Sequence, residues 1–179
     1  MNKLIFLDVD GVICTIRDRF SKFDRWCLKL LYFILYITKA NIVVSSEWRL
    51  KTLEDTKAKF LQAGFSPKWI HRVIGQTPNL FYKDGGRLPR GIEIKKWLYE
   101  NGCRYDYKEY VILDDDSDML YEQRKRFVRT NIYFGLTPYT TLKAIFKLFY
   151  QKELMKRLRW KIRYWLLEVY LFFKRKQWT

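Results

Sequence analysis

The chain has 179 residues, enough for one domain with a substantial core but too few for two full domains. Hydrophobic residues make up 49% and aromatic residues 18% of it, which excludes an intrinsically disordered chain. The net charge of +16 indicates a polyanionic partner, either nucleic acid or an anionic membrane surface. Its three cysteines lack a paired spacing, so we expect a cytoplasmic protein, with peripheral membrane association left open.

The predicted elements alternate between strands and helices along the chain. Apolar and β-branched runs predict strands at residues 3–9, 41–45, 73–74, 110–114 and 131–134. Helical spacing predicts helices at 23–39, 52–63 and 92–101, the last one ended by Gly102, while 76–89 reads as a loop. This alternation predicts an α/β protein with a Rossmann-like, doubly wound parallel sheet.

The first strand ends in two carboxylates, Asp8 and Asp10, followed by Gly11. Side chains two residues apart on a strand point the same way, so both acids are expected on one side of the strand end. An ordinary exit from a strand into a turn has the same pattern, and the motif alone does not decide between turn and active site.

Further polar residues follow other predicted strands. Ser45 ends the second strand, and the acidic run from Asp114 to Asp118 ends the fourth. The carboxyl ends of parallel strands share one edge of a sheet, so these groups are expected together. Adjacent carboxylates repel one another without a cation, and the run therefore favours a Mg²⁺ site with one or two direct carboxylate ligands.

These residue types suit phosphoryl transfer through an aspartate nucleophile. Asp8 can attack phosphorus and bind the metal, and Asp10 can protonate the leaving group and later activate water. Ser45 can donate a hydrogen bond to a phosphoryl oxygen.

The order of DVDGV, VVSSEWR, RGIEIKKWL and YVILDDDSDM resembles the haloacid dehalogenase (HAD) superfamily of phosphohydrolases. The later segments, with Gly135-Leu136-Thr137, are similar to its compact swiss-army-knife branch, related to the phosphatase halves of nucleic-acid end-healing enzymes. The resemblance covers about residues 3–138, which predicts a HAD-like domain at 1–138 and a separate tail at 139–179.

The resemblance implies a role for each matching residue. Asp8 would form the aspartyl-phosphate and bind Mg²⁺, while Asp10 would be the general acid/base and touch the metal through its backbone carbonyl. Ser45 would bind phosphate, and Asp115, with Asp114 beside it, would complete the metal site.

The third motif departs from the family, which usually offers a lysine there. Here the matching position holds Arg90, whose planar fork can bind phosphate, with Lys95 as the second candidate. Ser46, Arg49 and Asp118 are adjacent to the motifs and are candidates for substrate contact or for supporting the site.

The spacing between the motifs leaves no room for a large cap domain. An uncapped site can admit a polymer end, so we expect a Mg²⁺-dependent phosphomonoesterase acting on nucleotide or nucleic-acid end phosphates. The alternative is a nucleic-acid- or membrane-binding protein whose HAD site is vestigial.

The tail from residue 141 to 179 carries 11 Lys and Arg against two acids, a net charge of +9. Apolar residues recur in it at helical spacing, which predicts a basic amphipathic helix. Three interpretations remain open: the helix packs on the sheet, lies on an anionic membrane, or binds nucleic acid.

Overall fold

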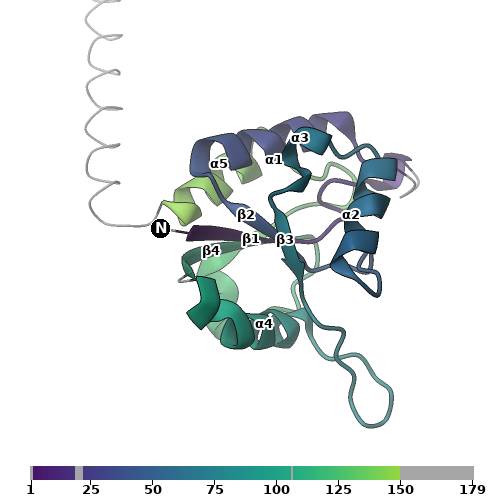
Figure 1. Ribbon diagram of the computed structural model, residues 1–179. Coiled ribbons are helices and arrows are strands. Elements are labelled where there is room, and N and C mark those ends of the chain that lie inside the picture. Colours follow the sequence, from purple (N-terminus) through teal and green to yellow (C-terminus); the bar gives the residue numbers. More distant parts are fainter. Residues whose placement is uncertain (1, 19–21, 106, 150–179) are drawn as a thin grey trace, which may run out of the picture. The chain divides into compact units, whose positions relative to one another are not determined.

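The computed structural model describes residues 2–18, 22–105 and 107–149 (Figure 1). The strands are β1 (Asn2–Leu7), β2 (Asn41–Val44), β3 (Val73–Gln76), β4 (Tyr107–Asp114) and β5 (Phe127–Arg129). The helices are α1 (Arg25–Thr38), α2 (Leu53–Gln62), α3 (Pro67–Ile70), α4 (Arg90–Tyr105) and α5 (Pro138–Leu148), with short 3-10 turns η1 (Ile16–Asp18) and η2 (Tyr121–Arg126).

The strands form one parallel sheet in the order β3-β2-β1-β4-β5. The chain begins at the centre with β1, builds outward to β3, and then returns to add β4 and β5 on the other side. The predicted doubly wound α/β fold is therefore confirmed. The winding direction changes between β1 and β4, and ligands bind at such switch points in open α/β sheets.

Helices cover both faces of the sheet, with α1 and α5 on one face and α4 on the other (Figure 1). The core beneath α4 contains Leu4 and Phe6 of β1 together with Ile94 and Trp97 of the helix. The Phe6 and Trp97 rings meet edge-on with centroids 5.5 Å apart. This packing fixes the direction of α4, and with it the place of its first residue, Arg90.

The last strand differs from the prediction. Residues 131–134 form a turn in which Asn131 accepts hydrogen bonds from the Tyr133 and Gly135 backbone N–H groups. The strand at this edge is β5, where the fully buried Val128 pairs with Leu113 of β4. The apolar run at 131–134 is exposed instead, because the Asn131 side chain stabilises a turn.

Gly102 does not end α4, as the sequence predicts, because the helix continues to Tyr105. A glycine inside a helix costs about 1 kcal/mol relative to alanine, which the packing of α4 on the sheet can outweigh.

The chain divides into two compact units, Met1–Leu148 and Phe149–Thr179. The first unit includes α5, which packs on α1 and β4 although the sequence analysis assigns it to the tail. The predicted amphipathic helix lies, from residue 150 onward, outside the described residues. In the described part of the chain, which ends at residue 149, no helix is both long enough and apolar enough to cross a membrane.

Candidate active site

Three neighbouring strands deliver polar side chains to one edge of the sheet. Asp8 follows β1, Ser45 follows β2, and Asp114 is the last residue of β4. The strand register aligns them, because Leu7 pairs with both Val44 and Leu113. The sequence-based expectation that these groups meet at one edge is therefore confirmed for Asp8, Ser45 and Asp114.

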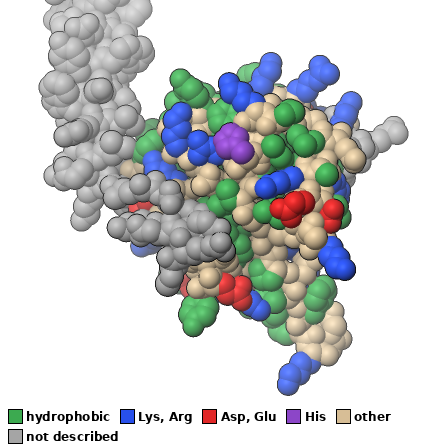
Figure 2. Space-filling view, in the orientation of Figure 1, with side chains coloured by type: hydrophobic (Ala, Val, Ile, Leu, Met, Phe, Trp, Pro, Cys, Tyr) green, Lys and Arg blue, Asp and Glu red, His purple; other side chains and the backbone are tan. Residues whose placement is uncertain are grey.

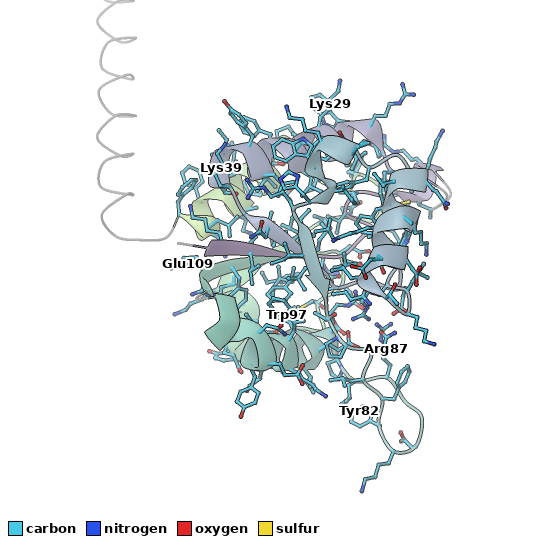
Figure 3. All side chains as sticks on the ribbon, in the orientation of Figure 1. Lys29, Lys39, Tyr82, Arg87, Trp97 and Glu109 are labelled. Atoms are coloured by element: carbon cyan, nitrogen blue, oxygen red, sulfur yellow. The ribbon has the colours of Figure 1, made fainter. Side chains whose placement is uncertain are left out.

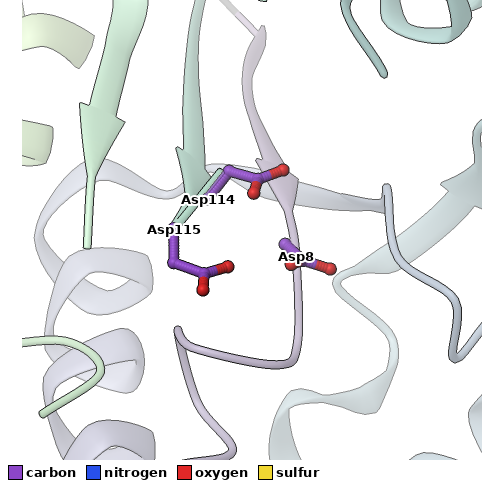
Figure 4. A group of neighbouring side chains, drawn as sticks. All are labelled: Asp8, Asp114 and Asp115. Carbon is purple, nitrogen blue, oxygen red and sulfur yellow. The ribbon is translucent and has the colours of Figure 1, made fainter. Parts of the chain in front are cut away.

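Three carboxylates converge at this edge (Figure 4). Asp8, Asp114 and Asp115 each offer an oxygen, and the three oxygens lie within 4.8 Å of one another. Asp8 and Asp114 are buried, and Asp115 is half-buried. The turn after β1 permits the approach: Gly11 has a φ of 67°, and a Cβ at this position would overlap the Asp115 carboxyl group.

This cluster fits a magnesium ion. Mg²⁺ prefers oxygen ligands and commonly takes one or two carboxylates, completing its shell with water and substrate phosphate. Asp114 Oδ2 is buried and, among the described residues, accepts no hydrogen bond. A buried carboxylate oxygen without a donor is costly unless a cation neutralises it.

Burial perturbs the acids of the cluster. Desolvation raises the pKa of Asp8 to about 6, against the lowering effects of Arg90 and of the Ser46 hydroxyl group. Desolvation, reinforced by the charge of Asp8, raises the pKa of Asp114 to about 8. The pKa of Asp115 is also raised, first by desolvation. The raised pKa values mean that the charged forms of the three acids are unfavourable without a cation. A bound cation would stabilise these charged forms.

Arg90 is the cation that the described chain brings to this cluster. Its guanidinium group lies 3.2 Å from Asp8 Oδ1 and 3.6 Å from Asp114 Oδ2, and it donates to the Ser45 carbonyl oxygen. The loop after β4 positions it, since Asp118 Oδ2 accepts a hydrogen bond of 2.8 Å from the Arg90 backbone N–H. Asp118 thus supports the start of α4.

The second motif supplies two hydroxyl groups with different surroundings. Ser46 is hydrogen-bonded to Asp8 and so stabilises its charged form. Ser45 Oγ is fully buried and has no hydrogen-bond partner among the described residues. A hydroxyl group left in this state beside a carboxylate cluster is a donor available to a bound oxyanion.

Asp10 is held by Trp48, a residue of the second motif that the sequence alone leaves open between core packing and substrate contact. The indole Nε1–H of Trp48 donates to both carboxylate oxygens of Asp10, at 3.0 and 3.1 Å. Trp48 is itself fixed by the Phe23 ring, 5.2 Å away between centroids, and by the Lys59 ammonium group 4.5 Å above its ring. Burial raises the pKa of Asp10, and the Trp48 hydrogen bond opposes that rise.

Arg49 is beside the site but is occupied by structural partners. It pairs with the buried Glu93 at 2.9 Å and also donates to Thr77, Pro78 and Asn79. Glu93 in turn accepts from the Leu80 N–H at 3.1 Å. Arg49 and Glu93 therefore anchor the start of the loop after β3. Apart from its place in the third motif, nothing in the local pattern indicates this role of Glu93.

Lys95, the second candidate for the third motif, lies away from the carboxylates. It is exposed and pairs with Glu122 at 3.0 Å. Asp116 is also exposed and does not belong to the three-carboxylate cluster.

No large cap interrupts the described chain between β3 and α4. The loop there folds back on itself through an antiparallel bridge between Phe81 and Arg87 and projects from the body of the domain (Figure 3). Arg87 anchors this loop to the rest of the domain through ion pairs with Glu47 and Glu93. Phe81 and Tyr82 are 60% and 50% exposed near its tip.

The fold and the carboxylate edge define a Rossmann-like α/β domain built around an acidic, magnesium-compatible site. The chain matches the model of a family described as "HAD domain in Swiss Army Knife RNA repair proteins" over residues 4–140. It belongs to this HAD family, so the resemblance inferred from the motifs is confirmed. No curated protein and no solved structure is significantly similar to the chain.

Proposed function

We propose that this protein is a Mg²⁺-dependent phosphomonoesterase that works through an aspartyl-phosphate on Asp8. The observation that carries the proposal is the convergence of Asp8, Asp114 and Asp115 within 4.8 Å, beside Arg90 and the unpartnered Ser45 hydroxyl group. Carboxylates alone would only bind a metal. The added cation and hydroxyl donor give the same site a way to hold phosphoryl oxygens.

Asp8, Asp114 and Asp115 would hold Mg²⁺, with the backbone carbonyl of Asp10 as a further ligand. The bound ion would neutralise charge on the phosphoryl group. Asp8 attacks phosphorus and displaces the alkoxide, and Asp10, held by Trp48, supplies the proton to the leaving oxygen. Asp10 then takes a proton from the water that hydrolyses the acyl phosphate, which restores both side chains.

Arg90 takes the place of the third-motif lysine in this proposal. Its guanidinium group contacts Asp8 and the Ser45 carbonyl oxygen, so it is close enough to Asp8 to donate to a phosphoryl group bound there. Arginine can donate two parallel hydrogen bonds to phosphate, which a lysine cannot. The arginine at this position therefore gives no support to the alternative of a vestigial site.

We propose nucleic-acid ends as the substrate. The family description names RNA repair proteins, and the loop after β3 places exposed Phe81 and Tyr82, with Lys83, on a projection anchored beside the site. Aromatic side chains next to a cation suit the bases and backbone of a single strand. A small phosphorylated metabolite would not reach such a projection.

The test compares phosphate release from oligonucleotides bearing a 3′- or a 5′-phosphate, from mononucleotides and from an aryl phosphate. With Mg²⁺, we expect one class of oligonucleotide end to exceed the mononucleotide in kcat/KM by about tenfold or more, the value of one stacked base. EDTA and Asp8→Asn should abolish release from every substrate. The matched control, Asp116→Asn, changes a neighbouring exposed carboxylate and should leave turnover within about twofold.

The loop is tested separately. Phe81→Ala/Tyr82→Ala should lower kcat/KM for the oligonucleotide about tenfold and leave the aryl phosphate unchanged. Equal rates on oligonucleotide and mononucleotide in the unsubstituted protein would contradict the proposed substrate class. Turnover that survives Asp8→Asn would contradict the mechanism itself.

A further inference from the structure

The outward sides of two packed helices, α1 and α5, both carry exposed apolar residues, and we call them together the α1–α5 face. The two helices pack against each other on one side of the sheet. The large exposed side chains on this face are Trp26, Phe33, Tyr36 and Ile37 from α1 and Tyr139, Leu142 and Phe146 from α5, with exposed fractions from 38% to 72%. Lone exposed apolar residues are ordinary, but so many on two adjacent helices indicate a binding surface.

The charges on this face have a single sign. Neither α1 nor α5 contains an aspartate or a glutamate, while Arg25, Lys29 and Lys143 are exposed on them. Lys143 lies over the Tyr139 ring, 6.0 Å from its centroid, and Lys39 lies 4.6 Å from the Tyr36 ring centroid. Figure 2 shows apolar and basic side chains interleaved over α1 and α3, with the visible acids lower in the view.

The aliphatic residues on the face decide which partner it fits. A nucleic-acid strand would use the cations and would stack its bases on the aromatic rings, but it would give the aliphatic side chains of Ile37 and Leu142 no comparable partner. An anionic bilayer satisfies both parts of the face. Its headgroups attract Lys and Arg, its interface accommodates Trp and Tyr, and the upper acyl region receives Phe, Ile and Leu.

We propose that the α1–α5 face docks the protein on anionic lipid membranes as a peripheral protein. The candidate active site lies at the carboxyl edge of the sheet and not on this face, so docking leaves the site open. The strongly basic sequence from residue 150 onward begins shortly after α5 and would add to the attraction between protein and membrane. This inference does not depend on the proposed phosphatase activity.

The test measures co-sedimentation of the full-length protein with vesicles of phosphatidylcholine alone or mixed with phosphatidylserine. We expect strong partitioning only onto the mixed vesicles, weakened by salt. Phe33→Gln/Ile37→Gln introduces a good helix former at both positions and so should preserve α1. It removes two apolar side chains from the face and should reduce partitioning by about tenfold or more. Lys29→Glu/Lys143→Glu should have a similar effect through charge.

The matched control is Tyr99→Gln/Tyr121→Gln, which removes two exposed aromatic side chains, at 88% and 81% exposure, from α4 and η2. It should partition like the unsubstituted protein, and all variants keep residues 150–179, so any difference arises from the α1–α5 face. Circular dichroism confirms folding of each variant, and the charge-reversal pair stands in if the apolar pair unfolds.

Three results would overturn the proposal. The face variants could partition as strongly as the unsubstituted protein, which would assign membrane binding to another segment. They could lose affinity for a single-stranded oligonucleotide while the unsubstituted protein ignores vesicles, which would make the face a nucleic-acid platform. Light scattering could show a dimer that Phe33→Gln/Ile37→Gln converts to a monomer, which would assign the face to a second copy.

Discussion

Two arginines, the buried Arg49 and the half-buried Arg90, lie at the carboxyl edge of the sheet and have different surroundings. Arg49 has one carboxylate partner, Glu93, and its two terminal nitrogens also donate to carbonyl, hydroxyl and amide oxygens of the loop after β3. Arg90 lies among Asp8, Asp114 and Asp115. In the Arg49 cluster two arginines, Arg49 and Arg87, balance two carboxylates, Glu93 and Glu47. In the Arg90 cluster three carboxylates surround Arg90, and a further arginine, Arg129, reaches only the backbone carbonyl oxygen of Asp115.

This difference indicates that the Arg49 cluster stabilises the fold, whereas the Arg90 cluster is suited to binding a metal ion and substrate. In the Arg49 cluster the partners are fixed by the fold, and nothing further is needed for neutrality. In the Arg90 cluster the carboxylates remain in excess. Among the described residues, Asp114 Oδ2 accepts no hydrogen bond, although Arg90 lies 3.6 Å away, and Ser45 Oγ has no hydrogen-bond partner. A metal ion and a phosphoryl group would satisfy both kinds of atom.

The largest effect is expected from Arg49→Met. Removing the guanidinium group takes the closest cation from the fully buried Glu93 and leaves it only the more distant Arg87, 3.8 Å away, which costs about 3–5 kcal/mol of unfolding free energy. Urea unfolding measures this, and the loss should be the same with and without Mg²⁺. The control is Lys96→Met, which breaks an exposed ion pair with Glu100 and should cost about 1 kcal/mol or less.

Arg90→Met should act on catalysis instead. We expect kcat to fall by about 10²–10³, the usual cost of removing a charge-stabilising donor. Lys95→Met, the matched control one turn along α4, should change kcat by less than about twofold, because Lys95 pairs with Glu122 at the surface. Equal losses in the two variants would contradict the assignment of Arg90 to the third-motif role.

The acids of the Arg90 cluster should make the metal-free protein sensitive to pH. The pKa values of Asp8 and Asp114, about 6 and about 8, lie above the ordinary 3.8, so the folded state binds more protons than the unfolded state. Their contribution to stability is fully present below about pH 4 and is lost as the pH rises through about 6 and 8.

This prediction is measured as the stability of the unsubstituted protein minus that of Asp114→Asn, in EDTA, over a pH series. The difference should fall as the pH rises, and Mg²⁺ should remove the fall because it binds the ionised acids. A difference that stays constant or increases with pH would show that the pKa values of these carboxylates are not raised in the folded protein.

The smallest effect is expected from Trp48→Phe, which keeps a ring in place but removes the donor to Asp10. We expect kcat to fall by about tenfold, the order of a lost hydrogen bond. The Trp48 hydrogen bond lowers the pKa of Asp10, so its loss should raise that pKa and shift the alkaline limb of the kcat profile to higher pH. An unchanged pH profile would mean that Trp48 is only a packing residue.

Much of the fold and the core of the site could be predicted from local patterns. The buried strand β1, the alternation of elements and the acids at strand ends are all visible in the sequence, and the parallel topology follows from them. Two predictions about secondary structure were wrong, namely a strand at 131–134 and a helix end at Gly102. The apolar residues at 131–134 belong to a turn fixed by the Asn131 side chain, and Gly102 lies within α4, where packing overrides its weak helix propensity.

The missing part of the site depends on contacts between residues distant in the chain. Trp48 and Asp10 are separated by 38 positions, and Arg49 and Glu93 by 44. No local pattern distinguishes a tryptophan that packs in a core from one that also donates to a carboxylate. The choice between Arg90 and Lys95 likewise depends on where the first turn of α4 points, which Asp118 and the packing of Trp97 determine.

The central claim is that Asp8 becomes phosphorylated during turnover. Quenching the protein in acid during hydrolysis, followed by borohydride reduction and peptide mass spectrometry, tests it most directly, since borohydride converts an acyl phosphate to an alcohol. We predict a reduced Asp8 in the peptide containing residues 4–9 only when both substrate and Mg²⁺ are present, and none after Asp8→Asn. Phosphate release without any modification of Asp8 would contradict the account.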